Sequence, residues 1–322
     1  MTVLVTGGAG YIGAHVVTLL RERGDSVVVV DDLITGIAER VEGLPLLNLD
    51  IADTSSIEPI ADMMREHSVT SVIHFAARKQ VGESVSEPAR YYRDNLGGLS
   101  NLLLAMESAG VGRIVFSSSA AVYGEPDANP VFETTPQSPI NPYGETKLYG
   151  EHLIKAAEKA GWLRGVSLRY FNVAGAANAM LSDRVALNLI PMVIEKIVAG
   201  EAPKVFGDDY PTADGTCIRD YVHVIDLAEA HLVALDALTD GRDISSEYNI
   251  GTGTGSSVRE VVDAVSKVSG NEIEAEICPR RPGDPAILIA DVGRARDELG
   301  WHARLGLQDM VQSSWSGWLA TH

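Results

Sequence analysis

Three side chains near the middle of the chain have the types and spacing for acid–base chemistry at a carbon that bears a hydroxyl group. Tyr143 and Lys147 are four residues apart in a segment with a helical pattern, so they share one face of the helix. A tyrosine with an ordinary pKa of about 10 is a poor base at neutral pH, but a neighbouring positive charge favours its phenolate form. Ser119 lies upstream in a serine-rich segment, and its hydroxyl is suited to hydrogen-bonding the reacting oxygen. A Tyr-x-x-x-Lys pair alone is more often a chance pair on a solvated helix, so its meaning depends on what else the chain carries.

The first residues of the chain have the pattern of a dinucleotide site. An apolar run leads into Gly7, Gly10 and Gly13, and a helical pattern follows. In such a loop the first glycine permits a tight turn, the second lets the backbone approach a pyrophosphate, and the third lets the helix pack on the strand. The helix N-terminus then offers its N–H groups to the phosphates. Together with the serine, tyrosine and lysine, this loop predicts redox chemistry with a bound dinucleotide.

An acidic residue at the end of the second apolar run selects between the common dinucleotides. Asp31 stands at about the distance from the loop at which a carboxylate binds ribose hydroxyls. A carboxylate repels a 2′-phosphate, and Asp32 rather than an arginine follows it, so NAD is favoured over NADP. Asp50 and Ile51 follow the third apolar run, where an acid and an apolar residue are suited to holding adenine.

A second glycine-rich stretch, 251–255, also follows an apolar run and precedes a helical pattern. A second nucleotide site would need its own strand–helix–strand unit, which the rest of the chain does not clearly supply. We therefore interpret this stretch as a turn that leads into a helix cap.

Short apolar runs alternate with amphipathic stretches through the first half of the chain, which predicts a βαβ organisation. The four valines at 27–30 show no polar alternation, as expected for a strand buried on both faces. The fold class is therefore α/β, with a Rossmann-like, doubly wound parallel sheet. Predicted strands cover 2–6, 27–31, 46–49, 71–75, 113–118 and 165–170. Predicted helices cover 11–23, 56–66, 89–109 and 142–160.

The alternation stops near residue 172, where polar loops rich in glycine and proline begin. A helical pattern at 222–237 and a strand pattern at 247–250 indicate that the chain returns to the first sheet. We expect an NAD-binding domain over 1–171, with a return at 222–250, and a smaller C-terminal substrate-binding domain over 172–322. The other predicted helices of the second half cover 185–199, 258–269, 293–299 and 306–319.

Composition excludes several classes of partner. A net charge of −18 over 322 residues argues against nucleic acid and anionic membranes. Two cysteines are too few for a disulfide framework, and no apolar stretch reaches the roughly 18 residues of a membrane helix. With no recognisable signal peptide, we expect a cytoplasmic protein.

The histidines lack metal-ligand spacing, so we expect no metal site. We interpret His74 as a core residue and His223 and His231 as structural.

The motifs together resemble the extended short-chain dehydrogenase/reductase family and, within it, the UDP-glucose 4-epimerase family. The resemblance runs essentially from end to end of the chain. It includes Val-Thr-Gly-Gly-Ala-Gly-Tyr-Ile-Gly at 5–13 and Asn-Pro-Tyr-Gly-Glu-Thr-Lys at 141–147. The other matching stretches are 74–84, 117–124, 168–172, 207–224 and 281–284.

The resemblance implies an enzyme that interconverts UDP-galactose and UDP-glucose. Tyr143 would take the proton from the sugar 4-hydroxyl while hydride passes from carbon 4 to NAD. The 4-keto sugar would then turn over in the site, and hydride would return to its other face. Lys147 would bind the nicotinamide ribose and tune Tyr143, and Ser119 would assist proton transfer.

The same resemblance assigns the remaining candidate residues to two sites. Arginine is suited to the substrate diphosphate, because its guanidinium makes bidentate contacts with phosphate oxygens. The candidate cofactor-binding residues are Gly7, Gly10, Tyr11, Ile12, Gly13, Asp31, Asp50, Ile51, Phe75, Ala76, Ala77, Lys79, Asn95, Ser117, Tyr143, Lys147 and Tyr170. The candidate substrate-binding residues are Ser119, Tyr143, Asn172, Asn188, Leu189, Phe206, Arg219, Arg281, Asp284 and Leu288.

Leu288 stands where the resembling family carries a bulky tyrosine that limits the sugar pocket. A smaller residue there leaves room for a 2-acetamido group. This predicts that UDP-N-acetylglucosamine and UDP-N-acetylgalactosamine are also substrates.

Other functions on the same fold stay open at this point. A dehydratase would need an acid–base pair after the serine, where this chain has Ala120 and Ala121, which disfavours elimination. A decarboxylase or a UDP-glucuronate 4-epimerase remains an alternative, whereas a non-catalytic NAD-binding regulator is disfavoured by the intact serine, tyrosine and lysine. The resemblance also implies a homodimer, formed through the helices near 89–109 and 142–160.

Overall fold

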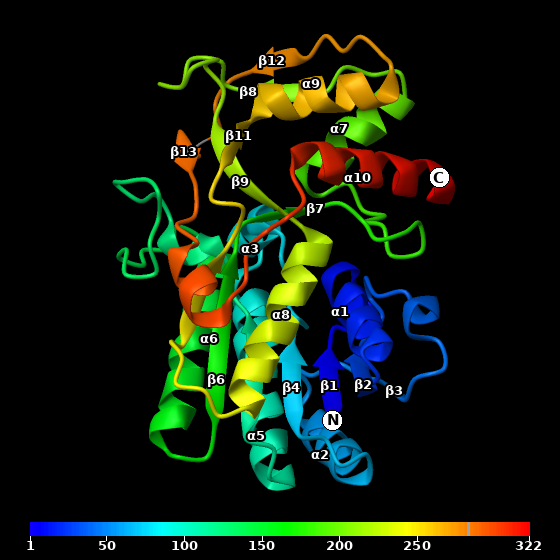
Figure 1. Cartoon of the computed structure of the whole chain (residues 1–322), viewed down its shortest axis with the longest axis vertical. Helices are drawn as coiled ribbons and strands as arrows, with labels where there is room; N and C mark the ends of the chain where they lie inside the picture. The colour runs from blue at the N-terminus through cyan, green and yellow to red at the C-terminus, as the bar shows by residue number, and fades with distance from the viewer. Residues whose placement is uncertain (282–283) are drawn as a thin grey trace. The chain divides into compact units, whose positions relative to one another are not determined.

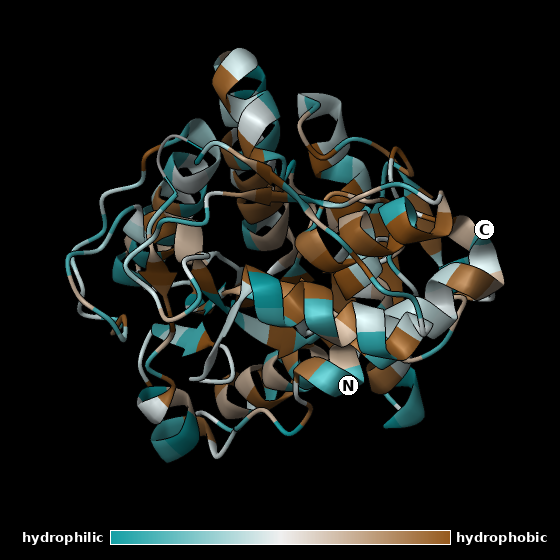
Figure 2. Ribbon diagram, turned by 90° about the horizontal axis from the view of Figure 1, so that it is seen from above, coloured by the Kyte–Doolittle hydropathy of each residue, from teal (hydrophilic) through white to brown (hydrophobic). Residues whose placement is uncertain are grey.

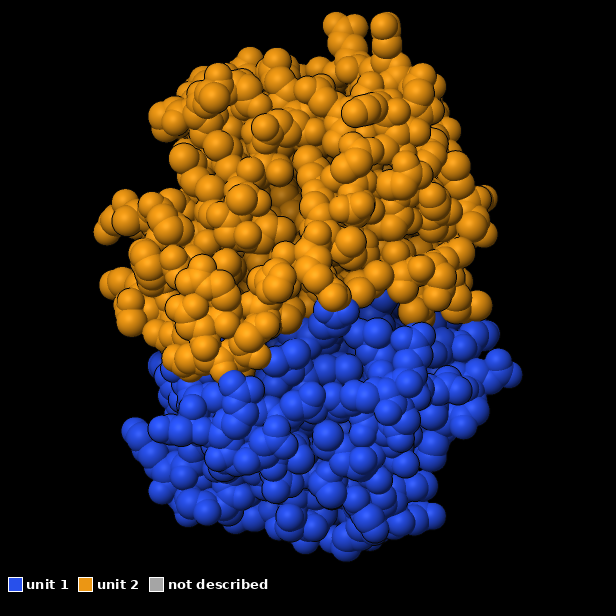
Figure 3. Space-filling view, in the orientation of Figure 1, with its two compact units in different colours: residues 1–124, 137–169, 228–248 blue, residues 125–136, 170–227, 249–322 orange. Residues whose placement is uncertain are grey.

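The computed structural model describes residues 1–281 and 284–322, and this part of the chain divides into two compact units (Figure 3). The first unit comprises residues 1–124, 137–169 and 228–248. The second comprises residues 125–136, 170–227 and 249–322. The inclusion of 125–136 in the second unit has no counterpart in the sequence pattern, because this short segment contains neither a helix nor a named strand.

A seven-stranded sheet is the central element of the described residues (Figure 1). Its strand order is β10-β6-β5-β4-β1-β2-β3, and the registered pairs from β3 to β6 are parallel. The chain first builds outward from β1 to β3 and then restarts on the other side of β1 with β4, so the topological switch point lies between β1 and β4. This is the doubly wound parallel sheet that the sequence predicts. The strands are β1 (Thr2–Thr6), β2 (Ser26–Asp31), β3 (Leu46–Asn48), β4 (Ser71–His74), β5 (Arg113–Ser117), β6 (Arg164–Tyr170) and β10 (Glu247–Ile250).

Helices of the first unit pack on this sheet through aliphatic side chains. The hydrophobic core joins residues such as Leu4, Val28 and Ile114 of the strands to Ile60 and Leu102 of two helices. The valines of β2 are buried, as expected for a strand covered on both faces. Figure 2 shows hydrophobic and hydrophilic residues alternating around the surface helices. The helices here are α1 (Tyr11–Glu22), α2 (Ile57–Glu66), α3 (Val81–Ser86), α4 (Pro88–Tyr91), α5 (Gly98–Ala109), α6 (Pro142–Lys159) and α8 (Val224–Thr239).

The predicted helix at 89–109 differs most from the structure. It is divided into α4, a π-helical segment at Tyr92–Gly97, and α5. Periodicity cannot show this division, because one π-turn shifts the apolar stripe by a single residue. The helix predicted at 222–237 begins two residues later, since Val222 and His223 end a strand.

The second unit has a separate core of three helices and short strands. Its helices are α7 (Leu189–Val198), α9 (Val258–Ser269) and α10 (Leu307–Thr321), and residues such as Ile194, Val265 and Met310 fill the core. The helix predicted at 293–299 is a short π-helical segment at Ala295–Leu299. The strands are β7 (Asn172–Ala174), β8 (Lys204–Phe206), β9 (Ile218–His223), β11 (Gly255–Ser257), β12 (Glu276–Cys278) and β13 (Ile287–Leu288).

β9 organises these short strands. It is parallel to β7 and β13 and antiparallel to β11. A separate parallel pair is formed by β8 and β12. Sequence patterns missed all six strands because β9 overlaps a helical pattern and the others contain only two or three residues.

Candidate active site

The start of α6 fixes the position of Tyr143. The side chain of Asn141 caps the helix by accepting a hydrogen bond from the N–H of Gly144 (2.9 Å), and Pro142 occupies the first helical position. Gly144 lets the helix approach the loop that follows β5, since a Cβ there would lie 2.6 Å from the carbonyl oxygen of Ala121. Tyr143 is therefore held in the first turn of the helix, beside the serine-rich segment, and its side chain is buried.

The structure brings Ser119, Tyr143 and Lys147 together as predicted from their spacing. The Ser119 side chain is hydrogen-bonded to the Tyr143 phenol. The Lys147 ammonium is buried and donates a hydrogen bond to the carbonyl oxygen of Ser117 (2.7 Å). Its Nζ lies 5.9 Å from the centre of the Tyr143 ring and 5.1 Å from that of Phe116. The three side chains thus surround one point at the carboxyl end of β5.

Electrostatics in the chain alone differ from the sequence expectation. Burial raises the pKa of Tyr143, and the hydrogen bond from Ser119 only partly opposes this. The Lys147 ammonium, by contrast, donates its hydrogen bond to the Ser117 carbonyl rather than to the phenol. Burial lowers the pKa of Lys147 to about 7, while the charge of Glu151 acts in the opposite direction. A phenolate therefore needs a further positive charge, which the oxidised nicotinamide ring of a bound dinucleotide would supply.

The glycine loop at the switch point has the geometry that its spacing predicts. Gly7 has a φ of +67°, and a Cβ there would lie 2.8 Å from the backbone nitrogen of Ala76. A Cβ at Gly13 would lie 2.2 Å from the carbonyl oxygen of Gly7, so only glycine lets α1 start this close to β1. Gly10 is the N-cap of α1 and no side chain caps it, which leaves the first-turn amides of Tyr11 and Ile12 facing the loop.

Asp31 reaches this loop from the end of β2. Its buried carboxylate accepts hydrogen bonds from the N–H groups of Ala9 (2.9 Å) and Leu33 (2.9 Å), while burial raises its pKa. The backbone of Gly10 also donates to this carboxylate, and because a carboxylate has about four acceptor positions, some capacity remains for a ribose hydroxyl. An uncapped helix start, a glycine turn with no space for side chains and a carboxylate beside it fit a dinucleotide such as NAD.

The other candidate cofactor residues lie along the same edge of the sheet. Ile51 is buried and packs under α5, where a Cβ at Gly98 would meet it at 2.9 Å. Asp50 is exposed and accepts a hydrogen bond from the N–H of Ala52 (2.8 Å). Phe75 follows β4 and lies 4.7 Å from the His231 ring, measured between centroids. The half-buried Ala76 comes next, and Ala77 and Lys79 are exposed.

Asn95 holds the loop that carries these residues. Its side chain accepts a hydrogen bond from the N–H of Arg78 (2.7 Å) and donates to the Arg78 carbonyl (3.0 Å) and to the hydroxyl of Thr146 (3.0 Å). Asn95 thus joins the segment after β4 to α6. The contact of Asn95 with the cofactor stays a prediction. The same holds for Tyr170, which is the last residue of β6 and belongs to the second unit.

Within the second unit, contacts join five of the candidate substrate residues. Arg219 on β9 forms an ion pair with Asp284 (3.4 Å), and Leu288 on β13 is its registered neighbour. The guanidinium carbon of Arg281 lies 3.9 Å from the centre of the Phe206 ring. The N–H of Asp284 donates to the carbonyl of Arg281 (3.3 Å), which links the two groups. These contacts connect Arg219 and Arg281 through Asp284.

Three further candidates lie outside these contacts. Asn172 is exposed on β7, where it is the registered neighbour of Tyr221 on β9. Asn188 is the N-cap of α7 and donates a hydrogen bond to Asp183 (3.4 Å). Leu189 follows it and packs against the core of the second unit. Their predicted role in binding the nucleotide part of the substrate is not tested by these contacts.

The second glycine-rich stretch is occupied by the protein's own side chain. The buried carboxylate of Asp220 accepts hydrogen bonds from the N–H groups of Thr252 (2.8 Å), Gly253 (3.0 Å) and Ala290 (3.1 Å), and from the Thr252 hydroxyl (2.8 Å). The following helix, α9, has a capping box made by Ser257 and Glu260. This agrees with the interpretation as a turn that leads into a helix cap.

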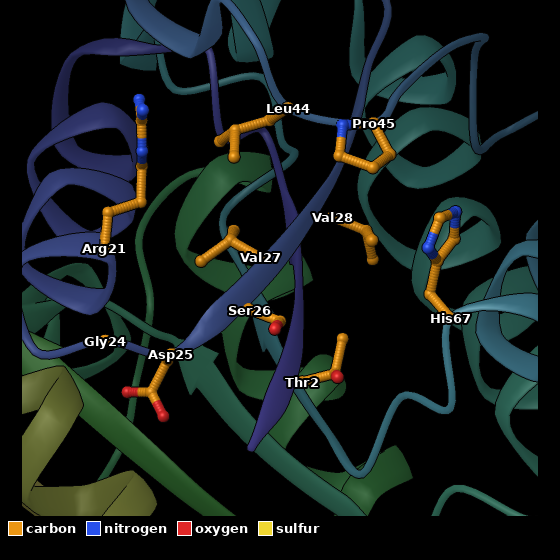
Figure 4. A pocket seen from close by; sticks show the side chains of 10 residues that line it. All are labelled: Thr2, Arg21, Gly24, Asp25, Ser26, Val27, Val28, Leu44, Pro45 and His67. Atoms are coloured by element: carbon orange, nitrogen blue, oxygen red, sulfur yellow. The ribbon is translucent and has the colours of Figure 1, made fainter.

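A cavity of about 470 Å³ lies at the opposite end of the strands of the first unit (Figure 4). Arg21 and His67 stand on two sides of it, and the valines at 27 and 28 belong to its lining. It contains none of the candidate site residues. It lies at the amino ends of β1 and β2, whereas parallel sheets bind ligands at their carboxyl ends.

Within residues 1–281 and 284–322, no three His, Cys, Asp or Glu side chains are arranged to hold a metal ion. No helix there combines the length and the apolar character needed to cross a membrane. The cytoplasmic location stays a prediction.

A model of the NAD dependent epimerase/dehydratase family matches residues 3–251. The chain belongs to this family. A UDP-glucose 4-epimerase of Halalkalibacterium halodurans from the same family is 45% identical over 329 residues, which cover 100% of this chain and 96% of the relative. The family resemblance predicted from the motifs is confirmed.

Solved structures of epimerases show the same fold along the whole chain. The UDP-glucose 4-epimerase of Stenotrophomonas maltophila, with bound NAD and formylated UDP-arabinopyranose, has a TM-score of 0.94 and 43% identity, covering 99% of this chain and 98% of that chain. The UDP-Glc/GlcNAc 4-epimerase of Campylobacter jejuni has a TM-score of 0.87 and 36% identity, covering 99% of both chains.

Sequence reasoning missed a buried polar cluster behind the candidate catalytic residues. Ser118, Glu151 and Arg169 are buried and joined by hydrogen bonds. One signal was available, because Glu151 follows Lys147 by four residues and shares its helix face. Asp220 was also missed, because its partners are 32 to 70 residues away in sequence.

Proposed function

We propose that this chain is a UDP-glucose 4-epimerase that interconverts UDP-galactose and UDP-glucose with bound NAD. The observation that carries the proposal is the arrangement of Ser119, Tyr143 and Lys147 at the sheet edge that also bears the glycine loop. Full-length relatives named UDP-glucose 4-epimerase, and solved relatives with bound NAD, support it. The first unit would hold NAD, and the second would hold the UDP-sugar.

The side chains of the first unit would carry out proton transfer. Tyr143 would accept the proton of the sugar 4-hydroxyl and later return it, while Ser119 would hydrogen-bond the same oxygen. Lys147 would hold the nicotinamide ribose and keep positive charge near the phenol. When bound, NAD supplies a reversible hydride acceptor, so the cycle needs no net reductant.

The second unit would bind the part of the substrate that does not react. Arg219 and Arg281 would contact the diphosphate, with Asp284 orienting Arg219 through their ion pair. Binding through the nucleotide leaves the hexose free to rotate, which inversion at carbon 4 requires.

The deciding experiment is NMR of the purified protein with UDP-galactose and no added reductant. We expect UDP-glucose to appear and the same final ratio to be reached from either sugar. No conversion with NAD supplied would contradict the proposal, and UDP-glucuronate would be tested next. Tyr143→Phe is the matched control: it should bind NAD normally and lose turnover by more than about a thousandfold.

A second substrate class is favoured by one residue of the second unit. Leu288 lies beside Arg219 in the register of β13 and β9, next to the proposed diphosphate contact. A leucine here leaves more space than a tyrosine, and a relative named for both UDP-Glc and UDP-GlcNAc has the same fold. We expect turnover of UDP-N-acetylglucosamine that Leu288→Tyr reduces while UDP-glucose turnover persists. Negligible turnover of acetamido sugars in both proteins would contradict this.

A homodimer is part of the same proposal. Leu104 on α5 and Tyr149 on α6 are 49% and 45% exposed, and they lie on the two helices that the family resemblance implies for the interface. Light scattering should give twice the monomer mass for the natural protein and a smaller mass for the double variant Leu104→Glu, Tyr149→Glu. A monomeric natural protein at micromolar concentration would contradict the proposal.

A further inference from the structure

A buried ion pair lies directly behind the candidate catalytic residues. Glu151 on α6 and Arg169 on β6 have side chains that are each 1% exposed. The guanidinium donates from Nε to Oε1 (2.9 Å) and from Nη2 to Oε2 (2.6 Å), which is a bidentate contact. Nη1 donates to the hydroxyl of Tyr123 (3.0 Å). Oε1 also accepts a hydrogen bond from the hydroxyl of Ser118 (2.5 Å).

Stability alone does not explain this pair. Removing two charges from water costs several kcal/mol for each ion, and apolar residues of similar volume often stabilise such a position better. Loss of one partner would leave an unpaired charge in the core. A pair in this place therefore calls for a further role, and its neighbours show what that role is.

Three consecutive serines contact three positions of α6. The Ser117 carbonyl accepts a hydrogen bond from Lys147, the Ser118 hydroxyl donates to Glu151, and the Ser119 side chain is hydrogen-bonded to Tyr143. Tyr143, Lys147 and Glu151 are spaced by four residues along one side of the helix. The outer serines meet the proposed catalytic residues, and the middle one meets the ion pair.

We propose that the Glu151–Arg169 pair is a positioning device for the reaction, which acts through Ser118 to hold the serine segment in register with Tyr143 and Lys147. The Ser118 backbone is also fixed, since its N–H donates to the Leu168 carbonyl (2.9 Å) one residue before Arg169. The serine segment is thus attached to both α6 and β6. The reaction named here rests on the proposed function, whereas the positioning of Lys147 does not.

The charge of Glu151 has a second effect, on Lys147. The groups that face the ammonium are Glu151 and Tyr143 from α6, His74 from β4, and the Phe116 ring and Ser117 carbonyl from β5. His74 is buried with its pKa lowered to about 3, so it is neutral. Glu151 is therefore the negative charge that opposes the effect of burial on Lys147.

Ser118→Ala tests the link without breaking the ion pair. Its matched control is Ser71→Ala, because Ser71 is a buried serine of β4 whose hydroxyl has no hydrogen-bond partner among residues 1–281 and 284–322. We expect Ser118→Ala to lower kcat by about tenfold to a hundredfold with KM and NAD content unchanged. Ser71→Ala should retain natural kcat. Equal kcat values for the two variants would overturn the proposal.

Glu151→Gln tests the charge, with a readout that needs neither substrate nor turnover. The chain has seven lysines, and NMR of protein labelled at the lysine Cε follows their titration, with Lys147→Met assigning the signal. We expect the Lys147 pKa to fall by about one unit in Glu151→Gln. The pKa of the alkaline limb of the kcat/KM pH profile should fall with it. An unchanged Lys147 pKa in a folded Glu151→Gln protein would overturn the electrostatic role.

If the Glu151→Gln variant does not fold, Ser118→Ala still decides the positioning role. An inactive natural protein would contradict only the proposed function.

Discussion

Two glycine-rich loops of this molecule look alike in sequence and differ in what their amides contact. The loop at Gly7–Gly13 follows β1 and enters α1, and the loop at 251–255 follows β10 and leads through β11 into α9. In the first, α1 has no side-chain cap. In the second, Asp220 accepts two loop amides, and Ser257 and Glu260 cap α9. In both loops a carboxylate of the protein accepts a loop amide, from Asp31 in the first and Asp220 in the second, but only the helix after the second loop is also capped by side chains.

The comparison shows what a glycine motif requires in order to bind phosphate. Glycine spacing provides backbone that can approach another group closely, and it does not determine which group that is. A buried carboxylate within reach turns the same backbone geometry into an internal hydrogen-bond network. Both loops have an acidic residue on a nearby strand, so the feature that separates them is the helix cap: α1 has no side-chain cap, and α9 has one.

Removing the internal anion should produce the largest effect. Asp220→Ala deletes the acceptor of three backbone N–H groups and the Thr252 hydroxyl in a buried site. We expect the second unit to lose about 4 kcal/mol of unfolding free energy, measured by urea denaturation of the apoprotein. Asp291→Ala is the control, because the half-buried Asp291 accepts only the Gly293 N–H (3.0 Å) among the described hydrogen bonds and should cost under about 1 kcal/mol. Equal losses would show that Asp220 does not organise the loop.

The first loop should respond in ligand binding rather than in stability. Gly10 has a φ of −72°, which any residue adopts, and a Cβ there would meet only the Gly7 carbonyl oxygen, at 3.1 Å. Gly10→Ala should fold with nearly natural stability, but its methyl group would occupy the space that the pyrophosphate approaches. Calorimetry should show NAD affinity reduced by about a hundredfold, equal to about 2.7 kcal/mol. Natural NAD affinity in this variant would remove the functional distinction between the loops.

The sequence predicted the sheet and the proximity of the three candidate catalytic residues because both depend on local patterns. Buried parallel strands leave unbroken apolar runs such as 27–30, and residues four apart on a helix share a face wherever the helix is placed. The spacing of Tyr143 and Lys147 therefore predicted their proximity correctly. Ser119 was found because it directly follows a recognisable strand.

The parts that sequence patterns missed depend on contacts between distant segments. β13 has two residues and exists because it pairs with β9, some 70 residues earlier. The sequence does not distinguish Asp220 from the other acidic residues, because its hydrogen-bond partners at 252, 253 and 290 are distant in sequence. Burial raises the pKa of Tyr143 in the chain without cofactor, and spacing could not predict this, because it shows a neighbouring charge but not the extent of burial.

Acid should weaken the region next to the first loop. His74 is buried beside Thr6, with Nδ1 2.6 Å from the threonine hydroxyl, and its pKa is lowered to about 3 by burial and then by Lys147. The unfolded chain, with a histidine pKa of about 6.5, binds the proton more readily, so stability is fully present above pH 6.5 and is lost as pH falls towards 3. Between pH 7 and 5 we expect a loss of about 2 kcal/mol attributable to His74. The measurement is the difference in unfolding free energy between the natural protein and His74→Gln at each pH, and a constant difference would contradict it.

The smallest effect should come from the second loop's own glycine. Gly253 has a φ of +73°, and a Cβ would lie 3.1 Å from the Val292 side chain, so Gly253→Ala adds backbone strain and a close contact. We expect a loss of about 1 to 2 kcal/mol with no change in NAD affinity, because these amides bind Asp220 rather than a ligand. Gly24→Ala isolates the strain, since Gly24 has a φ of +88° and nothing within 4 Å of its Cβ position. A weakened affinity for NAD in Gly253→Ala alone would mean that the second loop also takes part in nucleotide binding, and the proposed difference in ligand binding between the two loops would then fail.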